Sequence, residues 1–206
     1  MNVRLQYAIR FLGGVYYADQ LQMNEYTVKI YMMTNTYNPE NHNVALNRIK
    51  YFITTELENT IFIDSADEEN CRKLTSIGLN ITTLPGDPVD QLIGIMLLTK
   101  LSAITEDKMI IGEVEVSSIL GDNIVYIHSE NETSDDIIMP LWWNSVDLIH
   151  CDPDLIDGEK VVTMHKSSVW RDIDLHWPDI EDNTDDDNDN DEQNNTVEFK
   201  KPDDTK

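Results

Sequence analysis

The residues best suited to hold a metal ion lie late in the chain. The run His150-Cys151-Asp152 offers three possible ligands, and His165, His176 and Cys71 could complete a zinc site. Neighbouring side chains on a strand point to opposite sides, so this run cannot hold one ion without a special loop. The spacing matches no standard zinc pattern, so we favour a loop with scattered polar residues. A metal-dependent enzyme that uses His128, His150, Cys151 or His165 is the alternative.

Carboxylates are the second group that could do chemistry. Asp172, Asp174 and Asp179, with the aspartates from 185 onward, resemble calcium ligands in type. The glycine and the final glutamate of an EF-hand loop are missing, so a solvated, weakly cation-attracting segment is favoured.

Glu113 and Glu115 would share one face of a strand, where we expect exposed decoration of an antiparallel sheet and no acid–base role. Phosphate-binding and nucleophile motifs are absent, and Gly13-Gly14 is too short to cradle a phosphate. The sequence therefore predicts a protein that is not an enzyme and binds no cofactor.

All four tryptophans fall within 36 residues of irregular sequence. Tryptophan is enriched at binding hot spots, and it also closes small cores when a terminal segment wraps back over a sheet. We favour the core interpretation and leave an exposed partner site open. The candidate partner-binding residues are Trp142, Trp143, Trp170, Trp177 and, in the tail, Asp185, Asp186 and Asp187.

The charge balance limits the choice of partners. Fifteen Lys and Arg oppose 39 Asp and Glu, a net charge of −24, so a phosphate backbone is repelled on average and direct nucleic-acid binding is not expected. Residues 179–206 carry 12 acidic and 3 basic side chains, a net of −9, with few apolar ones. We expect one domain over residues 1–178 and a disordered acidic tail over 179–206.

Two cysteines without a CxxC motif favour free thiols in a reducing compartment. The first twelve residues alternate polar and apolar and contain Arg4 and Arg10, which is unlike a signal peptide. The most apolar stretch, 92–98, is far shorter than the ~20 residues that span a bilayer. We therefore expect a cytoplasmic protein that does not enter a membrane.

Periodicity predicts nine main elements in the order ββαβαβαββ. Strands are expected at 3–11, 26–33, 61–63, 80–84, 109–116 and 124–128, and helices at 41–57, 64–78 and 87–105. Gly13-Gly14 should form a turn or bulge, Asn41 or Asn43 should cap the first long helix, and Asp87 with Pro88 should start the last. Asp64 or Ser65 should start the middle helix.

The helix at 87–105 is apolar on most sides, which places it centrally. A charge at Met96 or Leu97 should therefore unfold the domain. The fold class that follows is α+β: an antiparallel or mixed sheet of five to six strands with the two main helices on one face. The second face would be covered by the tryptophan-rich segment or by a partner.

Part of the chain, from Val44 to Glu132, resembles a known group of proteins. The matching segments are Asn-Val-Ala-Leu-Asn-Arg-Ile-Lys-Tyr-Phe-Ile (43–53), Thr-Ile-Phe-Ile (60–63), Leu-Pro-Gly-Asp-Pro-Val-Asp-Gln-Leu-Ile-Gly (84–94), Gly-Asp-Asn-Ile-Val-Tyr-Ile-His (121–128), Trp142-Trp143 and His150-Cys151. They are similar to an uncharacterised protein group of tailed phages of marine cyanobacteria and other marine bacteria. The resemblance implies an auxiliary phage protein made in the bacterial cytoplasm, and it carries over no functional residue.

The leading functional prediction is a non-enzymatic auxiliary protein that binds a basic protein partner. Such a partner could belong to the nucleic-acid-processing machinery, whose basic groove an acidic protein can occupy. The alternatives are the metal-dependent enzyme and a structural or assembly component of a virion. The oligomeric state stays open.

Overall fold

The computed structural model describes residues 3–34, 38–129, 139–150 and 170–178. The strands and α-helices follow the predicted order ββαβαβαββ. The elements are β1 (Val3–Tyr17), β2 (Gln20–Thr34), α1 (Pro39–Tyr51), the π-helix η1 (Phe52–Glu56), β3 (Ile61–Asp64), α2 (Glu68–Ser76), β4 (Ile81–Leu84), α3 (Asp90–Thr105), β5 (Ile110–Ser118), β6 (Tyr126–Ser129) and the 3-10 helix η3 (Leu141–Asn144).

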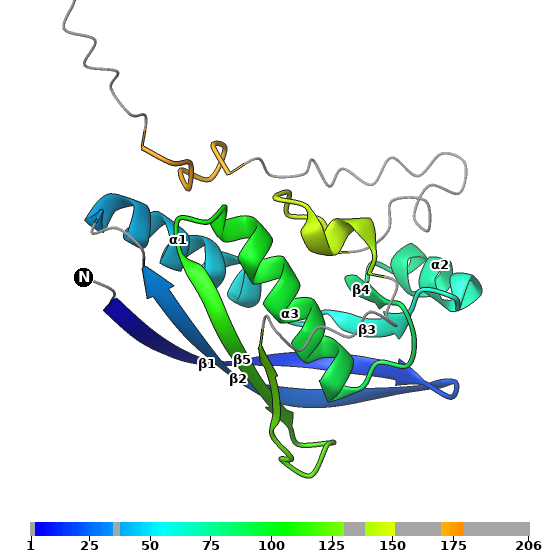
Figure 1. Ribbon diagram of the computed structural model, residues 1–206. Helices are drawn as coiled ribbons and strands as arrows, with labels where there is room; N and C mark the ends of the chain where they lie inside the picture. The colour runs from blue at the N-terminus through cyan, green and yellow to red at the C-terminus, as the bar shows by residue number, and fades with distance from the viewer. Residues whose placement is uncertain (1–2, 35–37, 130–138, 151–169, 179–206) are drawn as a thin grey trace, which may run out of the picture.

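The six strands form one mixed sheet in the order β4-β3-β1-β2-β5-β6. Strands β1, β2, β5 and β6 are antiparallel neighbours, whereas β3 runs parallel to both β1 and β4. Helices α1 and α3 lie on the same face of the sheet (Figure 1). The α+β class, the mixed sheet and the position of the two main helices are therefore confirmed, whereas the predicted tail lies outside the described residues.

The first hairpin is longer than predicted, and the turn or bulge expected at Gly13-Gly14 is wrong. Both glycines lie inside β1, which pairs with β2 over fifteen residues. The chain reverses at Ala18 and Asp19, whose φ angles of 49° and 58° suit a tight two-residue hairpin turn. Gly14 is needed for close approach, because a Cβ there would lie 2.6 Å from Cδ1 of Ile61 on β3.

The predicted helix starts also need correction. Asn38 caps α1 by accepting bonds from two backbone N–H groups, and Pro39 occupies the first turn. The Asn41 and Asn43 positions lie inside this helix. Asp67 caps α2, three residues after the predicted Asp64. Helix α3 begins after Val89 without any side-chain cap, so the Asp87 and Pro88 start is wrong.

The main core lies between the sheet and the helices α1 and α3, and a second, smaller core lies between α2 and the strands β3 and β4. Side chains of β2 alternate, and its inward-facing residues Tyr26, Val28, Ile30 and Met32 are all buried. Helix α3 is buried on nearly every side, as predicted, with Met96 and Leu97 fully inaccessible. Since each buried Leu or Ile stabilises the fold by roughly 1.5–3 kcal/mol, α3 is a major contributor to core energy. None of the helices among the described residues is long and apolar enough to cross a membrane.

The tryptophan-rich segment covers the helix layer, so its predicted place on the second sheet face is wrong. Element η3 packs on α3 and contributes the buried Trp142 and Trp143. Trp170 packs edge-on against Tyr51 of α1, with ring centroids 6.5 Å apart. Figure 1 shows both segments above the helices. On the opposite face, α2 packs against Ile61 and Ile63 of β3 through Cys71 and Leu74.

Candidate functional site

A buried cation holds the segment that contains two of the tryptophans. The Arg48 side chain projects from α1, is 3% exposed, and lies 4.7 Å and 4.1 Å from the ring centroids of Trp170 and Trp177. It donates to the carbonyl of Leu175 at 2.7 Å and to a carboxylate oxygen of Glu106 at 2.6 Å. Burial lowers the pKa of Arg48, and Glu106 opposes that effect. Arg48 therefore ties residues 170–177 to the helix layer.

A second buried cation holds η3 in the same way. Lys100 on α3 is fully buried, and its Nζ donates to the carbonyls of Trp142, Ser145 and Asp147 at 2.9, 2.8 and 2.5 Å. The ring of Phe52 lies 5.9 Å away on another side. Burial lowers the pKa of Lys100 from 10.5 to about 8. The amine is satisfied by three acceptors, which makes it a structural clamp.

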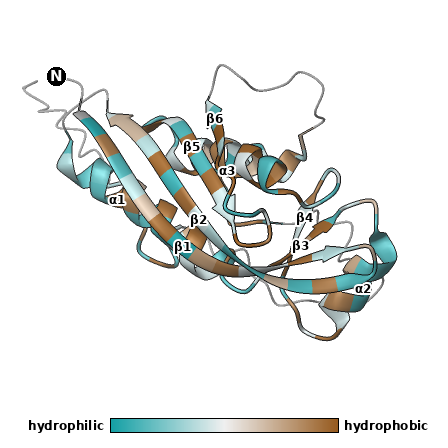
Figure 2. Cartoon of the chain, turned by 90° about the horizontal axis from the view of Figure 1, so that it is seen from below, coloured by the Kyte–Doolittle hydropathy of each residue, from teal (hydrophilic) through white to brown (hydrophobic). Residues whose placement is uncertain are grey.

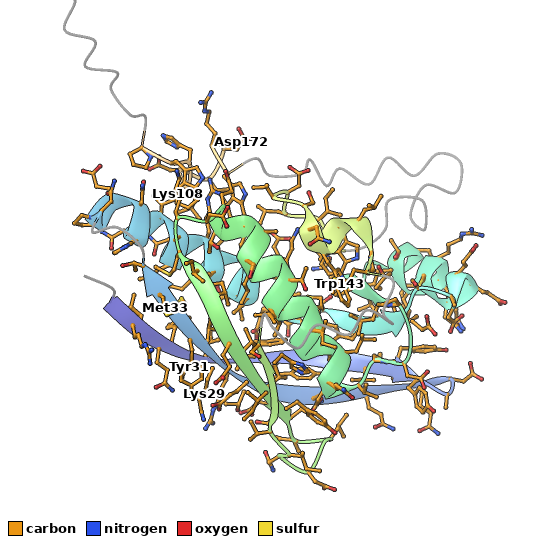
Figure 3. The ribbon with its side chains drawn as sticks, in the orientation of Figure 1. Lys29, Tyr31, Met33, Lys108, Trp143 and Asp172 are labelled. Atoms are coloured by element: carbon orange, nitrogen blue, oxygen red, sulfur yellow. The ribbon has the colours of Figure 1, made fainter. Side chains whose placement is uncertain are left out.

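The structure favours the core interpretation of the tryptophans. Trp142, Trp143 and Trp170 are buried, and Trp177 is half-buried over Arg48. Figure 3 shows Trp143 inside the molecule beside α3. Buried side chains offer little contact area to a partner in this conformation. The other candidate partner residues, Asp185, Asp186 and Asp187, lie outside the described residues, and their role stays a prediction.

The possible metal ligands are not brought together where the structure describes them. His150 Nδ1 lies 3.5 Å from Glu56 Oε2, and both side chains are largely buried. His128 lies on β6, against Gly94 of α3. No three His, Cys, Asp or Glu side chains among the described residues could share an ion. Cys151 and His165 fall outside those residues.

The other predicted ligands and thiols are also placed. Cys71 is a buried free thiol, and burial raises its pKa to about 11, with help from Asp67 and Asp64. Such a thiol is a poor nucleophile at neutral pH. Asp172 and Asp174 are exposed, and Asp179 lies outside the described residues.

Glu115 is not the exposed decoration that the sequence predicted. It is 14% exposed, and its carboxylate accepts bonds from Lys29 Nζ at 2.7 Å and from the Tyr31 hydroxyl at 2.6 Å. The bonds from Lys29 and Tyr31 lower the pKa of Glu115, whereas their bonds to Glu115 raise the pKa of each donor. All three groups thus move away from neutral pH, which suits a structural network better than acid–base catalysis.

A concentration of carboxylates surrounds the beginning of α2. We call Asp19, Asp64, Asp67, Glu68 and Glu69 the acidic corner, and Asp19, Glu68 and Glu69 are exposed. The carboxylates of the acidic corner contribute to the raised pKa of two neighbouring side chains. The pKa of Tyr16 is raised first by desolvation and then by Asp19 and Asp67, and Cys71 responds to Asp67 and Asp64 as described above. Periodicity could not find the corner, because Asp19 reaches it only through the hairpin turn.

Comparison with known proteins gives distant likenesses of overall shape. No family model and no curated protein matches the sequence. An uncharacterised protein from Wolinella succinogenes has a TM-score of 0.47 at 13% identity, over 63% of this chain and 99% of that one. A catalytic-residue mutant of Plasmodium vivax 6-pyruvoyltetrahydropterin synthase has a TM-score of 0.42 at 8% identity, over 62% of this chain and 97% of that one. Likenesses at this level assign no activity to the chain.

Proposed function

We propose that this protein is a non-enzymatic auxiliary factor that binds a basic protein partner through the acidic corner. The observation that carries the proposal is that carboxylates from the first hairpin, β3 and the start of α2 lie around Tyr16 and Cys71. Three of the five are exposed, and one of these, Glu68, is ion-paired with Arg72. Burial is the first cause of the raised pKa values of Tyr16 and Cys71, and these carboxylates add to it. The chain as a whole carries −24, so its long-range field also attracts positive surfaces.

The partner is defined by its chemistry as a positively charged surface, of the kind that otherwise binds phosphate groups. Proteins that process nucleic acids carry such surfaces, and the acidic corner would compete for them. The proposed setting is the cytoplasm of a bacterial host, with the gene carried by a phage. Opposite charges raise the association rate, and salt reduces that gain because the Debye length shrinks.

Neutralising the acidic corner tests the proposal. The partner is first captured from bacterial lysate on the full chain at low salt, and its association rate is then measured with purified proteins. The triple variant Asp19→Asn, Glu68→Gln, Glu69→Gln should associate about tenfold more slowly at low salt and like the wild type at high salt.

A matched control removes the same number of carboxylates elsewhere. The triple variant Glu40→Gln, Asp107→Asn, Asp122→Asn suits this purpose, because Asn tolerates the left-handed backbone of residues 19, 107 and 122 alike. The control should retain most of the wild-type rate. Equal slowing by both variants would contradict a role for the corner, and the absence of any salt-sensitive partner would contradict the function.

A further inference from the structure

We infer that a small hollow beside α1 binds the end of the acidic tail of the same chain, through Glu198 and Phe199. The hollow has a volume of about 370 Å³. It is lined by Arg48, Trp170, Arg171, His176 and Trp177. Figure 1 and Figure 2 both show α1 and α2 at opposite ends of the molecule, so the hollow is distant from the acidic corner at α2. The inference therefore concerns a different surface from the proposed function.

The lining of the hollow is cationic and aromatic on a chain that is otherwise acidic. Two arginines, one histidine and two tryptophans form it, and none of the five lining residues is a carboxylate, although the whole chain carries −24. Glu106 pairs with Arg48 but does not line the hollow. Such a lining suits an occupant that carries a negative charge and a flat apolar group.

Two shielded nitrogen atoms at the hollow find no hydrogen-bond partner in the described part of the chain. Trp177 Nε1 is buried and reaches no acceptor there. His176 Nδ1 is also buried, and its distance of 3.8 Å from Asp174 Oδ1 is too long for a hydrogen bond. The indole N–H can only donate, and so can the exposed guanidinium of Arg171. The group that completes the hollow is therefore an acceptor, and a carboxylate meets this need.

The tail contains one segment that joins a carboxylate to an aromatic ring. Residues 181–196 contain no apolar side chain, and Val197-Glu198-Phe199 follows them directly. Phe199 is the only aromatic residue after Trp177. Its ring can pack against the tryptophans while the Glu198 carboxylate accepts from the Trp177 N–H.

The charges that follow this segment also fit the surroundings of the hollow. Lys200 and Lys201 come directly after Phe199, whereas residues 179–196 contain no basic side chain. Asp172 and Asp174 lie between the lining residues in sequence and are exposed, and Figure 3 shows Asp172 projecting outward. These aspartates would repel a purely acidic segment and attract the two lysines. Charge therefore selects the end of the tail over its acidic middle.

Covalent attachment makes a weak contact sufficient. The lining ends at Trp177, and Glu198 follows Pro178 by twenty residues. A polar chain of that length spans roughly 25 Å, which corresponds to an effective concentration of roughly 1 mM. A contact with a dissociation constant of about 0.5 mM would then be closed about two-thirds of the time, and it would stabilise the fold only slightly. A free anion lacks this advantage and is repelled by the net charge.

The indole N–H signal of Trp177 in the ¹H–¹⁵N NMR spectrum of the full chain tests the inference. Its loss in Trp177→Phe identifies it. Phe199→Ser and Glu198→Gln should each move the signal in the same direction, because both changes empty the hollow. Raising NaCl from about 20 to about 500 mM should move the wild-type signal the same way and leave that of Phe199→Ser nearly unchanged.

A matched control changes charge in the middle of the tail. The triple variant Asp185→Asn, Asp186→Asn, Asp187→Asn removes three carboxylates and keeps Glu198 and Phe199. Its Trp177 signal should stay close to the wild-type position. An equal shift in this control and in Phe199→Ser would show a general response to tail charge and would overturn the inference.

Competition with the same segment in trans measures how often the hollow is filled. A synthetic peptide of residues 193–206 should move the Trp177 signal of Phe199→Ser with a dissociation constant of about 0.5 mM. The wild type should need about threefold more peptide, because its own tail leaves only about a third of the hollows open. Equal affinities, or no binding to Phe199→Ser, would overturn the inference. A signal that ignores the tail variants but moves with inorganic phosphate would assign the hollow to a free anion and overturn it equally.

Discussion

Two cations deep in the molecule hold its C-terminal segments in place. Lys100 and Arg48 each satisfy their donors with backbone carbonyls of residues that lie more than 40 positions away along the chain. The cost of burying each charge is offset by those bonds and by aromatic rings around the cation. Such clamps specify where an irregular segment docks, which apolar contacts alone do less well.

Replacing Lys100 by methionine should destabilise the protein and change its response to pH. Methionine leaves three carbonyls without a donor, so we expect a loss of ~2–4 kcal/mol at pH 7. Between pH 8 and 10.5, Lys100 is deprotonated in the folded state and protonated in the unfolded state, so wild-type stability gains with rising pH from this group. The gap between wild type and variant should therefore widen by up to about 3 kcal/mol across that window.

Denaturant unfolding at pH 7, 8.5 and 10 measures the gap directly. Lys108→Met, at an exposed position, is the matched control and should show a small gap that does not vary with pH. Comparing variants cancels the opposite contribution of the Cys71 thiol, whose raised pKa makes stability fall between pH 9 and 11. A gap for Lys100→Met that stays constant or narrows with rising pH would contradict the lowered pKa of Lys100, whereas a gap near zero at pH 7 would contradict the clamp.

The sequence places both cations on apolar stretches of helices, but residue types alone did not predict that they would be buried. Lys100 interrupts a run of apolar residues on a helix predicted to be central, and Arg48 falls three residues after Ala45 on the apolar face of α1. Long cationic side chains usually reach solvent from such positions, so burial was not the expectation. Their acceptors lie in irregular segments whose position only the folded chain defines.

At the scale of elements, helix α3 and strand β6 pack closely together at Gly94 and His128. A Cβ on Gly94 would overlap the ring of His128, so the helix and the edge strand approach through the missing side chain. In an exposed helix, Gly→Ala stabilises by about 1 kcal/mol, because alanine is the better helix former. At Gly94 the overlap with the ring of His128 should outweigh the gain in helix propensity.

Gly94→Ala should therefore destabilise the protein by ~1–3 kcal/mol, the usual range for an overpacked core. Gln91→Ala, at an exposed position on the same helix, is the control and should be neutral or slightly stabilising. Chemical unfolding gives both values, and amide exchange should show faster opening of β6 in the glycine variant. Stabilisation by Gly94→Ala would mean that the ring of His128 moves aside freely.

The types and order of elements were predictable, and their ends were less so. Alternation in β2 and the apolar faces of α1 and α3 are local patterns, and each predicted its element correctly. The extension of β1 through Gly13-Gly14 brings Gly14 against Ile61 of β3, which is a contact between distant segments that a local pattern does not predict. The π-helix at Phe52–Glu56, which the sequence did not predict, buries both Phe52 and Ile53.

At the scale of the whole molecule, the packed C-terminal segment and the acidic tail should differ in what they contribute. Trp170 and Trp177 lie against Arg48, so a chain that ends at residue 169 loses both rings and the bond to Leu175. Losing buried tryptophan contacts costs ~3–5 kcal/mol, which lowers the melting temperature by about 6–20 °C in a domain of this size. A chain that ends at residue 178 should melt within ~2 °C of the full length, because residues 179–206 are too polar to bury much surface.

Thermal unfolding of the two truncated chains makes this comparison. The 1–178 chain is the control for the 1–169 chain, since both lack the acidic residues of the tail. A large drop for the 1–178 chain would make the tail a structural element. Equal melting of both truncated chains would leave Trp170 and Trp177 without a stabilising role.

The candidate surfaces were predictable only in outline. Net charge predicted an attraction to positive partners, but the acidic corner forms because the first hairpin carries Asp19 to the start of α2. The clustering of tryptophans predicted either a core or a contact site, and the distinction required knowing which side of the sheet they cover. That side is set by the buried bonds of Lys100 and Arg48, which join segments far apart in sequence.

Strand β1 has hydrogen-bonded neighbours on both sides, an antiparallel one made by the next strand and a parallel one made after a helix. At Gly14 and Val15 it pairs with β2 on one side and with β3 on the other, so this strand joins the antiparallel and the parallel parts of the sheet. Cutting the chain near residue 60 would therefore leave β3, in the second fragment, with unpaired backbone groups on the side where β1 binds. We therefore expect the protein to tolerate truncation at residue 178 but not division near residue 60, which would separate β1 from β3.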